Sequence, residues 1–140
     1  MDQLITLLYV STIASKSDAT TTISDIAKEA RIRNAKDDVT GLLVFDGDQF
    51  VQLVEGPEAS MESLWARLQR DPRHTNLKMI FYGRTLAERR FQNWRLGYKT
   101  FDSKDEARLL RKLYGPISVQ VFMNMLPTMD QDIGDAFPKD

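Results

Sequence analysis

The segment from residue 39 to residue 57 constrains the fold of this chain more than any other. It contains two apolar runs, residues 42–45 and 50–54, joined through Asp46-Gly47-Asp48. An Asp-Gly pair between hydrophobic runs is one of the strongest short-range signals for a β-hairpin. We therefore predict two neighbouring antiparallel strands here.

Gln52 occupies an unusual place on the second of these strands. Because side chains alternate along a strand, Phe50, Gln52 and Val54 share one face of the sheet. A neutral amide is costly to bury without hydrogen-bond partners. Either a protein group or a ligand must therefore meet Gln52.

The rest of the apolar pattern predicts alternating strands and helices. Residues 4–10 have apolar side chains on both faces, as in a central strand, and Ile23, Ile26, Ala27 and Ala30 recur at the spacing of a helix that ends at about Asn34. We predict a second helix from residue 57 to residue 70 and further strands at residues 77–82 and 94–101. This order, β-α-β-β-α-β-β, is an α+β, ferredoxin-like arrangement with both helices on one face.

The second face of the sheet needs its own cover. Residues 104–114 and 116–126 carry apolar side chains at helical spacing, so we assign two C-terminal helices to that face. We expect a core of residues 1–101, a helical extension of residues 102–127 packed on the sheet, and a flexible tail of residues 128–140.

Composition excludes several classes of function. The 19 Lys and Arg residues nearly balance 20 Asp and Glu residues, so no global positive field favours nucleic acid or membrane surfaces. The absence of cysteine and the single histidine argue against a metal centre, and they fit a reducing compartment. With no signal peptide or spanning segment in the sequence, we expect a cytoplasmic protein. The common phosphate-binding glycine loops are also absent from the sequence.

Two more neutral polar side chains join Gln52 at positions that look buried. Tyr9 shares a face with Ile5 and Leu7, and Asn34 ends the apolar stripe of the first helix. The three side chains can satisfy each other or the backbone, with Asn34 acting only as a helix cap. They can equally face a planar heteroaromatic ligand that is rich in carbonyls and ring nitrogens.

Six segments together resemble the BLUF family of flavin-based blue-light sensors, in its short stand-alone form. They are Leu8-Tyr9-Val10-Ser11, Ala30-Arg31-Ile32-Arg33-Asn34, Thr40-Gly41-Leu42-Leu43, Phe50-Val51-Gln52-Leu53-Val54-Glu55-Gly56-Pro57, Asp71-Pro72-Arg73-His74 and Arg90-Phe91-Gln92-Asn93-Trp94. The early tyrosine, the Q-x-x-E-G segment and the D-x-R-H segment are specific as a set.

The resemblance implies a photochemical pair and a set of flavin contacts. Tyr9 matches the tyrosine that gives an electron and then a proton to the excited flavin, and Gln52 matches the glutamine that links this tyrosine to the flavin and then rearranges. The cofactor is expected to be FAD, with FMN as the other option. The residues that match or border the cofactor site are Tyr9, Ile26, Arg33, Asn34, Gln52, Asp71, Arg73 and His74.

One position departs from the family's pattern. Trp94 matches a tryptophan on the last strand, but Leu96 stands where the commoner W-x-M pattern has methionine. Leucine keeps the apolar volume and lacks the polarizable sulfur. We expect Trp94 and Leu96 to relay the signal from Gln52 to the last strand.

The residues and the resemblance together predict a blue-light photoreceptor and not an enzyme. It would bind flavin non-covalently and signal through the Tyr/Gln/flavin hydrogen bonds. Its output would be a change in association, in a homo-oligomer or with a downstream protein effector. Two alternatives remain. A small acyl-phosphate hydrolase would use the helix-borne Arg33 and Asn34, and a light-independent ligand-binding regulatory module would leave Tyr9 and Gln52 merely structural.

Overall fold

The computed structural model describes residues 3–85, 88–92, 95–101 and 103–126. Trp94 and the predicted tail, residues 128–140, lie outside the described residues. The elements are β1 (Leu4–Ile13), α1 (Ala19–Asp37), β2 (Thr40–Phe45), β3 (Gln49–Pro57), α2 (Glu58–Arg70), β4 (His74–Arg84), β5 (Gly97–Thr100), α3 (Asp105–Arg111) and α4 (Pro116–Met125). Their order confirms the predicted α+β, ferredoxin-like fold.

The five strands form one mixed sheet in the order β4-β1-β3-β2-β5. Neighbouring strands are antiparallel except β2 and β5, which are parallel. Strands β1 and β3 lie inside the sheet, and both are buried along nearly their whole length. Their apolar residues on both faces are thus explained by cover on both faces.

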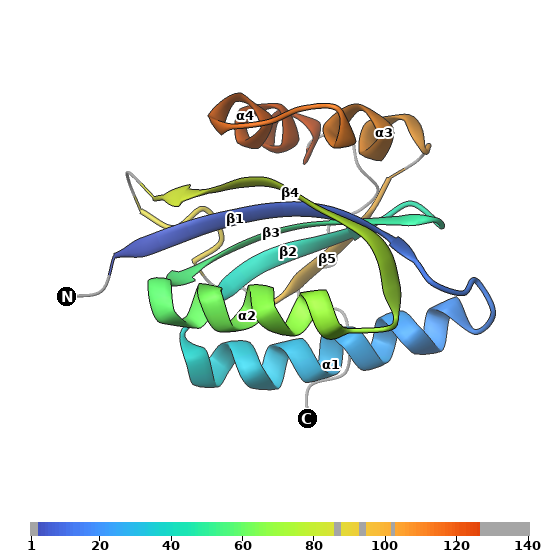
Figure 1. Cartoon of the computed structure of the whole chain (residues 1–140), viewed down its shortest axis with the longest axis horizontal. Coiled ribbons are helices and arrows are strands. Elements are labelled where there is room, and N and C mark those ends of the chain that lie inside the picture. Colours follow the sequence, from blue (N-terminus) through green and yellow to red (C-terminus); the bar gives the residue numbers. More distant parts are fainter. Residues whose placement is uncertain (1–2, 86–87, 93–94, 102, 127–140) are drawn as a thin grey trace.

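Helices cover the two faces of this sheet separately, as predicted (Figure 1). On one side α1 and α2 lie against the sheet, and Ile5 and Leu7 of β1 pack with Met61 and Leu64 of α2. On the other side lie α3 and α4, where Leu8 and its neighbours pack with Leu110 and Phe122, among others. Alternate residues of β1 therefore belong to opposite core layers. No helix that the structure describes is long and apolar enough to cross a bilayer.

The predicted hairpin forms with the predicted turn. Gly47 has φ 96°, and the Asp46 carboxylate accepts hydrogen bonds from the backbone N–H groups of Asp48 and Gln49 at 2.8 and 2.7 Å. Aspartate can bond to the backbone two residues ahead, and glycine adopts a positive φ without a steric penalty. This turn fixes the register that pairs Leu43 with Gln52.

Several predicted boundaries were wrong. Helix α1 continues one turn past Asn34, because Asp38 adopts a left-handed conformation (φ 61°) and its backbone N–H bonds to the Asn34 carbonyl. Asn34 is thus an inward-facing residue of the last turn and not the cap. Pro57 ends β3 in an extended conformation instead of starting α2. Strand β4 is longer than residues 77–82, and β5 is shorter than residues 94–101.

Candidate functional site

A cavity of about 360 Å³ lies between α1, α2 and the sheet. This volume falls in the range of small-molecule sites. Its lining residues come from both helices, the two central strands and the segment that follows α2. They are Tyr9, Ile26, Glu29, Ala30, Arg33, Asn34, Gln52, Leu64, Arg67, Leu68, Asp71 and Arg73.

Tyr9 and Gln52 form a buried pair in this cavity. They lie directly opposite each other on β1 and β3, where they are 4% and 6% exposed. The Tyr9 hydroxyl donates a hydrogen bond to Gln52 Oε1. The Gln52 amide nitrogen has no acceptor among the described residues, so one half of this amide is available to a ligand in the cavity.

The Tyr9 phenol is held in its neutral form. Burial raises its pKa, and the negative charge of Asp71 raises it further. A phenol in these surroundings keeps its proton at every physiological pH. Tyr9 Oη is therefore the donor in its hydrogen bond with Gln52.

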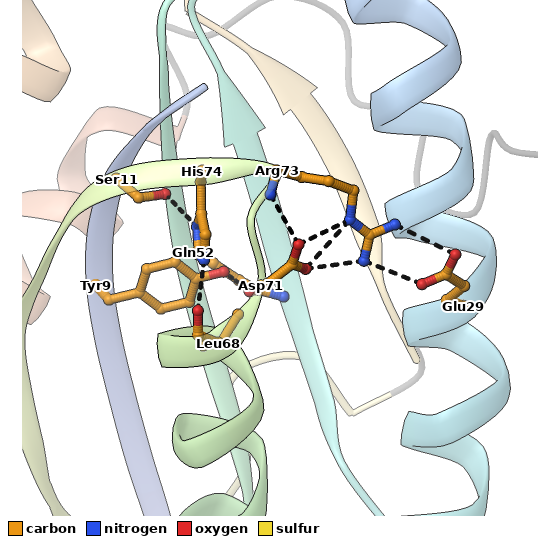
Figure 2. Close-up of polar contacts among 8 residues, drawn as sticks. All are labelled: Tyr9, Ser11, Glu29, Gln52, Leu68, Asp71, Arg73 and His74. Atoms are coloured by element: carbon orange, nitrogen blue, oxygen red, sulfur yellow. Dashed lines mark hydrogen bonds and ion pairs between the residues drawn. The ribbon is translucent and has the colours of Figure 1, made fainter. Parts of the chain in front are cut away.

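Glu29, Asp71 and Arg73, which line the cavity, form an ion-paired cluster (Figure 2). Arg73 Nη2 lies 2.8 Å from Asp71 Oδ2 and 3.0 Å from Oε1 of Glu29, on α1. Burial alone would raise the pKa of Asp71, but the hydrogen bonds and charge of Arg73 outweigh it, and the pKa lies below its usual value. The hydrogen bonds that Arg73 donates to Asp71 raise the pKa of Arg73 despite its partial burial. The cluster ties α1 to the segment after α2.

Helix α1 supplies further lining residues of the cavity. Asn34 is 2% exposed, and its side-chain nitrogen donates a hydrogen bond to the Arg95 carbonyl at 2.6 Å. Its side-chain oxygen has no donor among the described residues. Ile26 is half-buried and Arg33 is exposed, and both line the cavity.

His74 does not line the cavity, although we expected it to border the site. Its Nδ1 lies 2.9 Å from Ser11 Oγ, and its Nε2 lies 2.8 Å from the Leu68 carbonyl oxygen. The His74 and Tyr9 rings meet edge to face, with centroids 6.3 Å apart. Figure 2 shows His74 between Ser11 and Leu68, beside Tyr9. A role of His74 toward a cofactor stays a prediction.

A family model described as "Sensors of blue-light using FAD" (BLUF) matches residues 4–97, which contain β1 to α2, β4 and all the lining residues above. The chain belongs to the BLUF family. The solved dark-state structure of the BLUF protein BlrB is similar over 91% of this chain and 98% of that one, with a TM-score of 0.77 and 29% identity. The ground state of BlsA is similar over 91% and 90%, with a TM-score of 0.76 and 27% identity.

Two curated relatives are much longer than the matched segment. The chain is 39% identical over 74 residues to the blue light- and temperature-regulated antirepressor BluF of Escherichia coli (strain K12), which is 53% of this chain and 18% of that protein. It is 36% identical over 77 residues to the photoactivated adenylate cyclase subunit beta of Euglena gracilis, 55% of this chain and 9% of that protein. The shared part is thus the BLUF sensor module and not the whole of either relative.

One of the two predicted relay residues lies directly before β5 in this BLUF chain. Leu96 is fully buried and packs in a cluster with Ile23, Ala27 and Leu43, between α1 and the sheet. It does not line the cavity. Trp94 is outside the described residues, so the relay through Trp94 and Leu96 stays a prediction.

Sequence reasoning missed part of the site of this BLUF chain. Glu29 and Arg67 look like solvent-exposed charges in the sequence, and Leu64 and Leu68 look like ordinary core residues of a helix. The one available signal was the spacing of α2, because Arg67 follows Leu64 by three residues and therefore shares its face. That signal does not separate a lining arginine from a surface arginine.

The lining residues fit a flavin, the cofactor of BLUF proteins. The side chains of Ile26, Leu64 and Leu68 offer apolar walls, whereas Gln52 and Asn34 offer buried amide groups that can donate and accept. This pairing suits a planar ring system with carbonyls and ring nitrogens along one edge. The described residues contain no group of three His, Cys, Asp or Glu that could hold a metal ion.

Proposed function

We propose that this chain is a blue-light photoreceptor that holds a flavin non-covalently between α1, α2 and the sheet. The observation that carries the proposal is the buried hydrogen bond from Tyr9 to Gln52, inside the cavity of a BLUF fold. In this proposal Tyr9 and Gln52 are the photochemical residues, while Ile26, Arg33, Asn34, Asp71 and Arg73 hold the cofactor.

A bound flavin would supply blue-light absorption and, when excited, an electron acceptor. Tyr9 holds a proton at Oη and shares it with Gln52 Oε1. If the Gln52 amide turns over or changes tautomer, the group that faces Tyr9 changes between acceptor and donor. One side chain thereby changes the hydrogen bonds on both of its sides. Because the site is buried, any polar group left without a partner would be costly.

We propose FAD rather than FMN as the flavin. Arg33 and Arg67 line the cavity, and neither forms an ion pair with a described residue. Burial lowers the pKa of Arg67, and the positive charge of Arg33 lowers it further, while the charge of Asp37 offsets only part of this, so a bound anion here would be favourable. Two arginines beside a cavity suit the two linked phosphates of FAD. Analysis of the flavin released from the purified protein identifies the cofactor directly.

We also propose how the chain is divided and where it acts. Residues 1–101 would form the flavin-binding core, and residues 102–127 the extension that passes the signal on. The absence of cysteine is compatible with the cytoplasm. The output would be association with a further copy of the chain or with a protein effector, and not catalysis by this chain.

The test is an absorbance scan of the purified protein before and after blue light. We expect a yellow protein whose flavin spectrum shifts slightly to the red and returns in the dark. Protein that binds no flavin after FAD is added would contradict the proposal. Bound flavin whose spectrum does not respond to light would instead support the light-independent ligand-binding module.

A further inference from the structure

The side chain of Arg111 links the C-terminal end of α3 to three strands of the sheet. The Arg111 guanidinium donates hydrogen bonds to Gln49 Oε1 on β3 and to the Asn76 carbonyl on β4, each at 2.8 Å. It also lies 3.5 Å from Thr12 Oγ1 on β1. In return the Lys78 ammonium of β4 donates to the Arg111 carbonyl. Arg111 and β4 are thus bound to each other in both directions.

Of the two β4 residues that contact Arg111, Asn76 lies within an irregularity of the sheet and Lys78 lies at its end. Val10 of β1 pairs with Lys78, and Thr12 pairs with Thr75, so two residues of β4 oppose Ser11 alone. Asn76, one of these two, has φ 51°. This is a β-bulge, in which the ladder is interrupted and the strand can bend. We call residues 75–78 of β4 the β4 bulge.

The β4 bulge is linked to the cavity through Ser11 and His74. Ser11, which faces the bulge, contacts His74 Nδ1, and the other His74 nitrogen contacts the carbonyl of Leu68 in the cavity wall. The His74 ring rests edge-on against Tyr9. A continuous set of contacts therefore runs from Tyr9 through His74 to the β4 bulge, and from the bulge to Arg111.

Resting on the proposed function, we propose that Arg111 is a positioning residue that transmits the state of the flavin site to α3 through the β4 bulge. A planar guanidinium has donors in a fixed fork, so it can satisfy acceptors on three strands in only one arrangement of those strands. A small shift of β4 against β1 at the bulge breaks this arrangement and loosens the end of α3. This route is separate from the predicted one through Trp94 and Leu96.

The chain offers a matched control for this proposal on the same helix. Arg108 is exposed, and its ion pair is a long one to Asp105, three residues before it. Arg108→Gln and Arg111→Gln make the same chemical change, but only the second removes contacts with the sheet. A general effect of charge on α3 would appear in both variants.

The experiment is hydrogen exchange measured by mass spectrometry on the flavin-loaded full chain, in the dark and under blue light. In the unchanged protein we expect the exchange of α3 amides to differ between the two states by about threefold or more, as expected for a change in local opening. Arg111→Gln should keep the flavin red shift and lose this difference. Arg108→Gln should keep both.

A second variant, Gln49→Leu, removes the same contact from the strand side and should also lose the α3 difference, so the test stands even if Arg111→Gln fails to fold. A light-dependent difference of unchanged size in either folded variant overturns the role of Arg111, even when exchange has risen equally in both states. An unchanged protein that shows the red shift without any response in α3 overturns this inference and leaves the proposed function standing. Absence of the red shift overturns the proposed function itself.

Discussion

Tyr9 and Gln52 are placed by strand pairing, and their chemistry follows from that placement. Because they are directly opposite each other on β1 and β3, a rotation of the Gln52 amide changes the hydrogen bond of the Tyr9 hydroxyl. Burial removes water as an alternative partner. A glutamine at this position can therefore hold two distinct sets of hydrogen bonds without a change of backbone.

The raised pKa of Tyr9 predicts a specific loss of stability in alkali. In the unfolded chain the phenol ionises near pH 10, whereas in the folded chain burial and Asp71 keep it protonated. The contribution of the neutral Tyr9 phenol to stability is complete below pH 10, and it is lost as the pH rises toward the pKa of Tyr9 in the folded chain. Above pH 10 the free energy of unfolding of the unchanged protein should therefore fall faster with rising pH than that of Tyr9→Phe. The difference in slope should be up to about 1.4 kcal/mol per pH unit.

Denaturant unfolding of both proteins from pH 8 to pH 11.5 measures this difference. Tyr82 and Tyr98, whose pKa values are also raised by burial, are present in both proteins and cancel in the comparison. Parallel curves for the two proteins above pH 10 would show that Tyr9 ionises freely in the fold.

The sequence could identify Tyr9, Gln52 and Asn34, because alternation and helical spacing show polar side chains among apolar neighbours. It could not show that the His74 ring contacts Ser11 and the Leu68 carbonyl, since those contacts depend on how β4 pairs with β1. Roles inferred from the family resemblance for the remaining lining residues are still predictions.

Strand β3 carries a second buried polar group, on the face opposite Gln52. Glu55 is fully buried and accepts hydrogen bonds from the backbone N–H of Arg90 at 2.6 Å and from the Arg90 guanidinium at 2.7 Å. Thr6 of β1 donates to it at 3.3 Å. Glu55 thus ties β3 to the segment after β4.

Removing Arg90 should leave this carboxylate buried without its countercharge. We expect Arg90→Met to lower the free energy of unfolding by about 3 kcal/mol, the lower end for a broken buried pair because Arg90 itself is one-third exposed. The exposed Arg108→Met should cost less than about 0.5 kcal/mol. Chemical denaturation tests both, and equal costs for the two variants would refute the importance of the Glu55 pair.

At the scale of elements, local sequence signals predicted the turn and the helices but not the contacts between distant parts of the chain. The Asp46-Gly47 turn and the apolar stripes predicted the hairpin and α2 nearly in full, and the middle of α1. The β4 bulge and the Arg111 contacts join residues 35 to 99 positions apart, and no local pattern encodes them. The extra turn of α1 depends on a left-handed aspartate, which propensity alone disfavours.

The whole molecule is a sheet with two covered faces, so α3 and α4 are part of the fold. Phe122 is fully buried against Leu8, Val10 and their neighbours. Phe122→Ala should lower the free energy of unfolding by about 3–5 kcal/mol. Ile117→Ala, at a 63% exposed position on the same helix, should cost less than about 0.5 kcal/mol.

Thermal or denaturant unfolding of the two α4 variants tests whether this helix is integral. A Phe122→Ala protein as stable as the unchanged chain would mean that α4 does not pack on the sheet in solution. The loss predicted here would mean that light-driven changes in α3 act on a helix pair that the sheet holds firmly.

The same sensor module occurs in relatives with different outputs, an antirepressor and an adenylate cyclase subunit, and it makes up less than a fifth of each. In this chain α3 and α4 follow the residues that the family model matches, and the Arg111 contacts link α3 to the sheet.

The light-minus-dark absorbance spectrum of Tyr9→Phe, recorded beside that of the unchanged protein, tests the central claim most directly. The substitution removes only the hydroxyl that bonds Gln52 and leaves the apolar ring in place. We predict that Tyr9→Phe still binds flavin and shows no red shift, while the unchanged protein shows a reversible one. A full red shift in Tyr9→Phe would contradict the role assigned to the Tyr9–Gln52 hydrogen bond.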